Sequence, residues 1–142
     1  MLKAGEFDLQ RFLDAQAPVY QTVLEELAAG QKRSHWMWFI FPQLRGLGSS
    51  STAFKYGLAS REEARAFSEH AILGPRLREC TSIVMTIEGR TAEDIFSYPD
   101  HLKFRSCMTL FEQSARSPQL FRDALLKFFD GRPDGRTLEL LN

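Results

Sequence analysis

Two side chains in this sequence are suited to acid–base chemistry, and each lies beside groups that can bind an anion. His35 begins an aromatic run, and an imidazole titrates near neutral pH, which suits a general acid or base. Asp100 follows Pro99 at the start of a predicted helix. We predict His35 and Asp100 as candidate catalytic residues, for hydrolysis or N-glycosidic bond cleavage if the protein is an enzyme. The structural alternatives are a hydrogen-bonded histidine at the core edge and an ion pair from Asp100 to Lys103 along the helix surface.

The segment after the aromatic run has the composition of an anion-binding loop. Glycines let backbone N–H groups approach a ligand, and a serine that caps a short helix directs its positive end toward an anion. The pattern is neither a Walker loop nor a G-x-G-x-x-G fingerprint. With aromatic side chains as a wall, it suits a small anionic ligand such as a nucleotide or an ADP-ribose-like molecule. The predicted ligand-binding residues are Trp36, Trp38, Gln43, Arg45, Gly46, Gly48, Ser49, Ser50, Tyr56 and Lys103.

The aromatic run from Trp36 to Phe41 has two further interpretations. Large aromatic side chains dominate the energetics of protein cores, so the run can be a central plug between helices. The same side chains can instead form the exposed interface of a non-enzymatic interaction or adaptor domain. A concave, partly polar site around His35, Gln43 and Ser49 favours a ligand, whereas an exposed convex apolar patch favours a partner protein.

Composition narrows the partners. The chain has 142 residues, of which 44% are apolar, and Lys plus Arg equals Asp plus Glu at 18 each. This balance gives no overall attraction to nucleic acid or to an anionic membrane, and the longest apolar run is far below the ~20 residues of a membrane helix. The two cysteines form no zinc-type spacing and no cofactor motif is present, so we expect neither metal nor cofactor. Because the N-terminus lacks the apolar core of a signal peptide, we expect a cytoplasmic protein.

Proline, glycine and capping residues divide the chain into helices. We predict an all-α fold: one compact multi-helical domain over residues 1–142, with orthogonally packed helices and short loops. The β-branched stretch 83–87 is the one candidate strand, and it lacks a partner. Asp134 is expected to serve a turn, and Thr137 to cap the terminal helical turn. The other predicted helix starts are Asp8, Pro18, Ser34, Ser50 or Ser51, Ser60, Gly74, Thr91, Pro99 and Ser117.

The stretch HWMWFIFPQ, followed by GLGSS and then by A-x-x-Y-G, resembles the signature of a known family, domain of unknown function 1810 (DUF1810). The likeness continues through residues 73–77, 95–111 and 128–138, so it covers nearly the whole chain. It departs locally at Ser97, where a glycine is expected, and at Cys107, where a serine is commoner. The resemblance implies a small multi-helical protein and no established activity. Some members carry a calpastatin label, but an inhibitor of that kind is a disordered polar chain, unlike this composition.

Overall fold

The computed structural model describes residues 7–142, and its secondary structure within them is helical. The candidate strand at 83–87 belongs instead to the end of a helix and its cap, and the only β-type pairing described is a single parallel bridge between Leu44 and Leu58. The all-α prediction is therefore confirmed. The helices are α1 (Gln10–Gln16), α2 (Tyr20–Ala28), α3 (Met37–Ile40), α4 (Ser51–Tyr56), α5 (Arg61–Glu69), α6 (Leu73–Thr86), α7 (Ala92–Phe96), α8 (Asp100–Ser114), α9 (Gln119–Phe129) and α10 (Gly135–Leu141).

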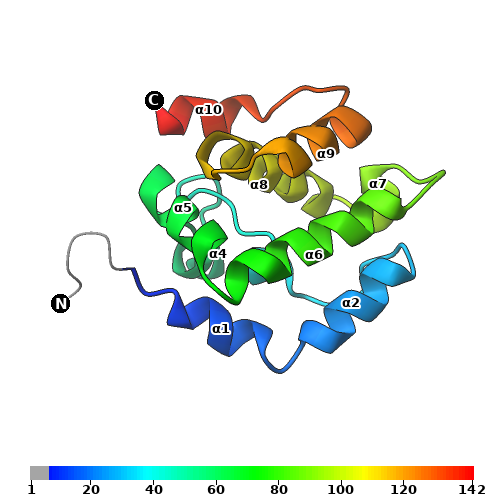
Figure 1. Ribbon diagram of the computed structural model, residues 1–142, viewed down its shortest axis with the longest axis horizontal. Helices are drawn as coiled ribbons and strands as arrows, with labels where there is room; N and C mark the ends of the chain where they lie inside the picture. The colour runs from blue at the N-terminus through cyan, green and yellow to red at the C-terminus, as the bar shows by residue number, and fades with distance from the viewer. Residues whose placement is uncertain (1–6) are drawn as a thin grey trace.

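Helix α8 is the centre of the fold, because α5, α7, α9 and α10 all pack against it. Over half of its residues are buried, including Phe104, Met108 and Phe111. Helix α6 crosses the molecule diagonally in Figure 1 and contacts α2, α3, α5 and α9. One hydrophobic cluster joins these elements. Helix α8 is thus a rigid support for any side chain on its exposed edge.

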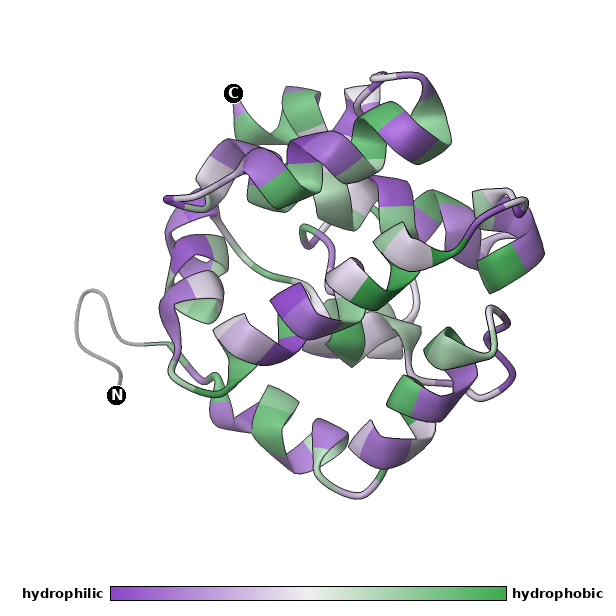
Figure 2. Cartoon of the chain, turned by 45° about the vertical axis from the view of Figure 1, so that its right-hand side comes forward, coloured by the Kyte–Doolittle hydropathy of each residue, from purple (hydrophilic) through white to green (hydrophobic). Residues whose placement is uncertain are grey.

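Apolar and polar residues alternate along the surface helices, as Figure 2 shows. This is the amphipathic pattern of helices that pack one face on a core and expose the other to water. In residues 7–142, none of the helices combines the length and the apolar character that crossing a bilayer requires.

Several predicted helix starts have the expected caps. Ser50 accepts a hydrogen bond from the Ala53 N–H (3.1 Å), and Ser60 accepts one from the Glu63 N–H (3.1 Å). Thr91 forms a complete capping box at the start of α7. These agreements reflect local chemistry, because a cap and its acceptor are only three residues apart.

Three predicted caps are wrong. Helix α1 begins after Leu9 rather than Asp8, and α3 begins after Trp36 rather than Ser34. The Ser34 hydroxyl instead donates to the buried Glu26 carboxylate, a partner from an earlier helix that local spacing does not reveal. Helix α10 begins one turn earlier than predicted, because Asp134 is its N-cap and Thr137 is the residue that donates.

The aromatic run fills the core. Trp36, Met37, Ile40 and Phe41 are each at most 2% exposed. The Phe41 ring packs edge-on against the ring of Phe104 from α8 (5.1 Å between centroids). These four residues match the core-plug interpretation, whereas Trp38 and Phe39 of the same run are half-buried.

Candidate functional site

A shallow groove of about 300 Å³ forms where three segments far apart in the sequence meet. They are the loop 43–48, the start of α8, and the N-terminal turn of α10. Three of the predicted ligand-binding residues, Gln43, Gly48 and Lys103, line this groove together. The remaining lining residues are Leu47, Pro99, Leu102, Ser106, Asp134 and Arg136.

The loop wall is fixed by backbone pairing and by close contact. The Leu58 N–H donates to the Gln43 carbonyl (3.0 Å), and the Arg45 N–H donates to the Leu58 carbonyl (2.7 Å). Gly48 lies so near α4 that a Cβ atom there would be 2.7 Å from the Cβ of Ala53. The glycine therefore allows the loop to approach α4 and brings Gly48 to the groove.

The α8 wall holds its cation in a fixed position. Asp100 pairs through one carboxylate oxygen with Lys103 (3.3 Å) and through the other with Lys32 (2.8 Å). The Lys103 ammonium also lies over the ring of Trp38, 4.4 Å from its centroid. A cation held between a carboxylate and an aromatic face loses little conformational freedom when it binds a ligand. The two lysines and one aspartate leave one net positive charge at the groove.

Hydrogen bonds between α8 and the loop before α10 hold the third wall of the groove in place. Arg105 donates to the carbonyls of Arg132 (2.9 Å) and Pro133 (3.1 Å), and the Asp134 N–H donates to the Thr109 hydroxyl (2.8 Å). Arg105 therefore holds a loop. These bonds hold the loop that leads into α10 against α8, and Asp134 and Arg136 line the groove together with Lys103.

The two predicted catalytic residues have different surroundings. His35 is exposed and does not line the groove. Asp100 stands just behind the groove, with both carboxylate oxygens occupied by lysines. The predicted pair from Asp100 to Lys103 along the helix is present, which is the structural alternative stated for this aspartate.

The other predicted ligand-binding residues are dispersed. Trp36 is 1% exposed, so its ring packs in the core and offers no face to a ligand. Trp38 is half-buried and reaches the groove only through Lys103. Gly46, with a φ of +108°, and the exposed Ser49 and Ser50 lie outside the lining, while Arg45 and Tyr56 line separate hollows beside α5 and α1.

A buried carboxylate that we did not predict, Glu26, holds the segment 33–36 next to Lys32. Glu26 on α2 accepts the N–H groups of Arg33 (2.7 Å) and Ser34 (3.0 Å) and the indole N–H of Trp36 (2.9 Å), together with the Ser34 hydroxyl. Burial by itself raises the pKa of Glu26, but these hydrogen bonds outweigh it and lower the pKa to about 2. The sequence did carry a signal, since Glu26 lies at helical spacing between the buried Val23 and Leu27.

Lys32 and Ser106 were also not predicted, and for them the sequence carries no signal. Lys32 lies in a loop, and its N–H donates to the Ile95 carbonyl (2.7 Å), which brings the lysine to α8. Ser106 lies on a helix whose residues are mostly buried. Only the packing of the chain shows that both belong to this region.

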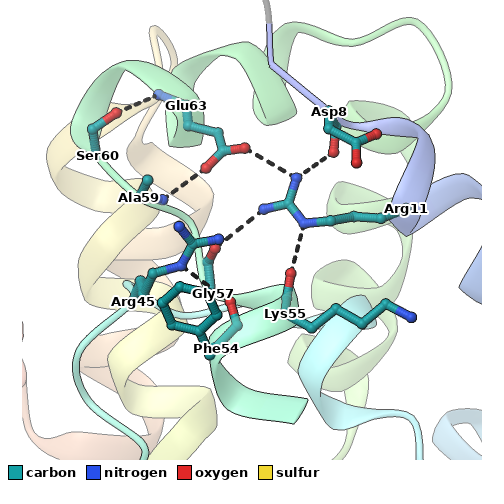
Figure 3. A network of polar contacts seen from close by, with 9 residues as sticks. All are labelled: Asp8, Arg11, Arg45, Phe54, Lys55, Gly57, Ala59, Ser60 and Glu63. Carbon is teal, nitrogen blue, oxygen red and sulfur yellow. Dashed lines mark hydrogen bonds and ion pairs between the residues drawn. The ribbon is translucent and has the colours of Figure 1, made fainter. Parts of the chain in front are cut away.

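A second polar network surrounds Arg11, and Figure 3 shows it as a structural clamp between α1, α4 and α5. Each nitrogen of the guanidinium donates to the protein, and four of its five N–H donors are in use, which is the pattern of a structural arginine. Its partner Glu63 is buried and also accepts the Ala59 N–H (2.7 Å). The acceptors of Arg11 are the carbonyls of Lys55 (2.7 Å), Gly57 (3.1 Å) and Asp8 and the Glu63 carboxylate (3.1 Å).

A family model described as a protein of unknown function (DUF1810) matches residues 6–141, nearly the whole chain. The chain belongs to the DUF1810 family. The crystal structure of the conserved hypothetical protein Rv1873 from Mycobacterium tuberculosis is similar to this DUF1810 chain, with 56% sequence identity and a TM-score of 0.94. The similarity covers 95% of this chain and 96% of that chain. A search of curated proteins finds no match.

Proposed function

We propose that this DUF1810 protein binds a small anionic ligand in the groove between the loop 43–48, α8 and α10. The observation that carries the proposal is the position of Lys103, whose ammonium group is fixed by Asp100 and Trp38 at the edge of a groove. A fixed cation beside unpaired polar groups is the usual means by which a small site recognises a phosphate or a carboxylate.

The charges around Lys103 support an anion rather than a neutral ligand. Because Lys32 also pairs with Asp100, Lys103 can bind a ligand without leaving the Asp100 carboxylate unpaired. Arg136 supplies a second cation in the groove lining; its guanidinium is largely exposed and pairs with Glu139 (3.7 Å). Two cations from different segments can hold two oxygens of the same phosphate or carboxylate.

The proposal is for binding rather than for a chemical step. His35 is outside the groove lining, and both oxygens of Asp100 face lysines, so neither is placed against a ligand in the groove. The volume also bears on the ligand. At about 300 Å³ the groove lies at the lower end of the range for small-molecule sites, which favours a mononucleotide-sized ligand over ADP-ribose.

A thermal-shift screen against nucleotides, sugar phosphates and nicotinamide derivatives tests the proposal. A ligand that binds only the folded protein at about a hundredfold excess over Kd adds about 2.7 kcal/mol of stability, which raises the melting temperature by about 5–10 °C for a chain of this size. We expect the rise in the wild type and its loss in Lys103→Gln.

The matched control is Lys55→Gln, which removes the same charge from an exposed residue outside this groove. Lys55→Gln should keep the full ligand-induced rise. The proposal is wrong if no compound in the panel stabilises the wild type, or if Lys103→Gln and Lys55→Gln respond alike to every compound that does.

A further inference from the structure

The groove contains hydrogen-bond acceptors as well as cations, and a simple anion does not use them. Asp134 and Ser106 line it together with Lys103 and Arg136. A carboxylate on the wall of a site repels a bare anion, so a ligand that also donates hydrogen bonds fits this groove better than a bare anion does.

Asp134 has one carboxylate oxygen in use and one that is free. Its Oδ2 accepts the N–H (2.9 Å) and the hydroxyl (2.6 Å) of Thr137, which is the N-cap interaction of α10. Its Oδ1 has no hydrogen-bond or ion-pair partner among residues 7–142, because Arg136 pairs with Glu139 instead. The cap therefore fixes the carboxylate at the groove and leaves one oxygen able to accept.

Ser106 and Gln43 add to this set. The Ser106 hydroxyl donates to the Leu102 carbonyl (3.1 Å), so its only proton is used and its oxygen faces other groups as an acceptor. The Gln43 carboxamide makes no side-chain hydrogen bond within the described chain, and it can both donate and accept. Acceptors thus line the same groove as the two cations.

We propose that the ligand is a phosphorylated monosaccharide, up to the size of a nucleoside monophosphate, whose sugar hydroxyls donate to Asp134 and Ser106 while its phosphate binds Lys103 and Arg136. This inference rests on the proposed function and narrows its ligand class. Leu47 and Leu102 provide apolar surface for the non-polar face of the sugar or for an attached base. The volume of about 300 Å³ accommodates one sugar with one phosphate.

An NMR titration of the ¹⁵N-labelled protein with ribose 5-phosphate and, separately, with inorganic phosphate tests the inference. Ribose 5-phosphate should bind at least about tenfold more tightly, because hydrogen bonds to a charged group contribute that much or more. Asp134→Asn should weaken the binding of ribose 5-phosphate by about tenfold and should leave the binding of inorganic phosphate unchanged or make it tighter. Asn caps a helix as well as Asp does, so α10 stays in place.

Two further variants keep the test decisive. Ser106→Ala removes the second acceptor and should weaken ribose 5-phosphate but not inorganic phosphate. Asp130→Asn removes the same charge as Asp134→Asn, in an exposed left-handed residue outside the groove where Asn is well tolerated, and it should change neither affinity.

The outcomes separate this inference from the proposed function. If both probes bind with equal affinity, and Asp134→Asn and Ser106→Ala affect them equally, the groove is an anion site without sugar recognition and the inference is overturned. If neither probe shifts the resonances of the groove residues, the proposed function is overturned together with it.

Discussion

Replacing Glu26 by Gln should destabilise the protein at neutral pH and flatten its stability profile in acid. The carboxylate accepts four hydrogen bonds from the segment 33–36: the three N–H donors bind Oε1, and the Ser34 hydroxyl binds Oε2. A carboxamide can keep its one oxygen on the N–H donors, but its NH₂ group then takes the place of the acceptor of the Ser34 hydroxyl. The Ser34 hydroxyl then loses its acceptor, and the three N–H groups bind a neutral oxygen in place of a charged one, which weakens each hydrogen bond. The segment that this carboxylate holds leads directly into the aromatic core and lies next to Lys32.

The size of the effect follows from the pKa of this carboxyl. Its lowering from 4.5 to about 2 corresponds to about 3 kcal/mol of preferential stabilisation of the charged form. Solvent beside the exposed Arg33 and His35 screens part of it, so we expect a loss of about 2 kcal/mol in the free energy of unfolding.

The pH dependence has a definite sign. The carboxyl of Glu26 binds a proton near pH 4.5 in the unfolded chain and only near pH 2 in the folded protein. The stabilisation is therefore fully present above pH 4.5 and is lost as the pH falls toward 2. Urea unfolding followed by far-ultraviolet circular dichroism, from about pH 7 to about pH 2.5, should show the wild type converging on Glu26→Gln in acid.

The neighbouring Glu25 supplies the control, because it is exposed on the same helix. Glu25→Gln should run parallel to the wild type at every pH. A difference between Glu26→Gln and the wild type that stays constant down to the acid limit would refute the argument, since it would show that the charge of this carboxyl contributes nothing.

Three further outcomes are expected. Gly74→Ala should lower the free energy of unfolding by about 3 kcal/mol or more, because the new Cβ would lie 2.2 Å from the Ser68 carbonyl oxygen. Gly135→Ala should be nearly neutral, because no atom lies within 4 Å of its new Cβ. Similar urea midpoints for the two variants would contradict this. Arg11→Met should lower the free energy of unfolding by about 3 kcal/mol in thermal or urea unfolding, because it leaves the buried Glu63 carboxylate without its cation. A loss below about 1 kcal/mol would show that the fold does not need this clamp. Both cysteines are buried, and burial raises the pKa of each thiol. A disulfide reagent at about pH 8 should therefore label neither cysteine until urea unfolds the chain. Rapid labelling of the native protein would contradict their buried placement.

The helices could be predicted from the sequence because their signals act over a few residues. Ser50, Ser60 and Thr91 each cap a helix by bonding a backbone N–H three positions later. Ser34 shows the limit of this reasoning. It has the residue type of a cap, but a carboxylate from an earlier helix competes for its hydroxyl.

The candidate groove could be predicted only in part. Gln43, Gly48 and Lys103 were selected for their chemistry and do line one groove, but the residues selected with them line other hollows, lie in the core or are exposed outside the groove. The aromatic run is apolar at every position, so no periodicity distinguishes the ring that packs inside from the ring that carries Lys103. Trp36 and Trp38 are the same residue type, and only tertiary contacts bury the first in the core and place the second against Lys103.

The sequence by itself determined the helical class and the main helix boundaries, because capping and turn formation depend on residue type and near neighbours. Tertiary structure decided which charges meet. Lys32, Asp100 and Lys103 form one cluster, and Asp134 lines the same groove as Lys103, because α8 gathers segments that are about a hundred residues apart in the chain. Such long-range contacts depend on the packing of whole helices, which no local spacing encodes.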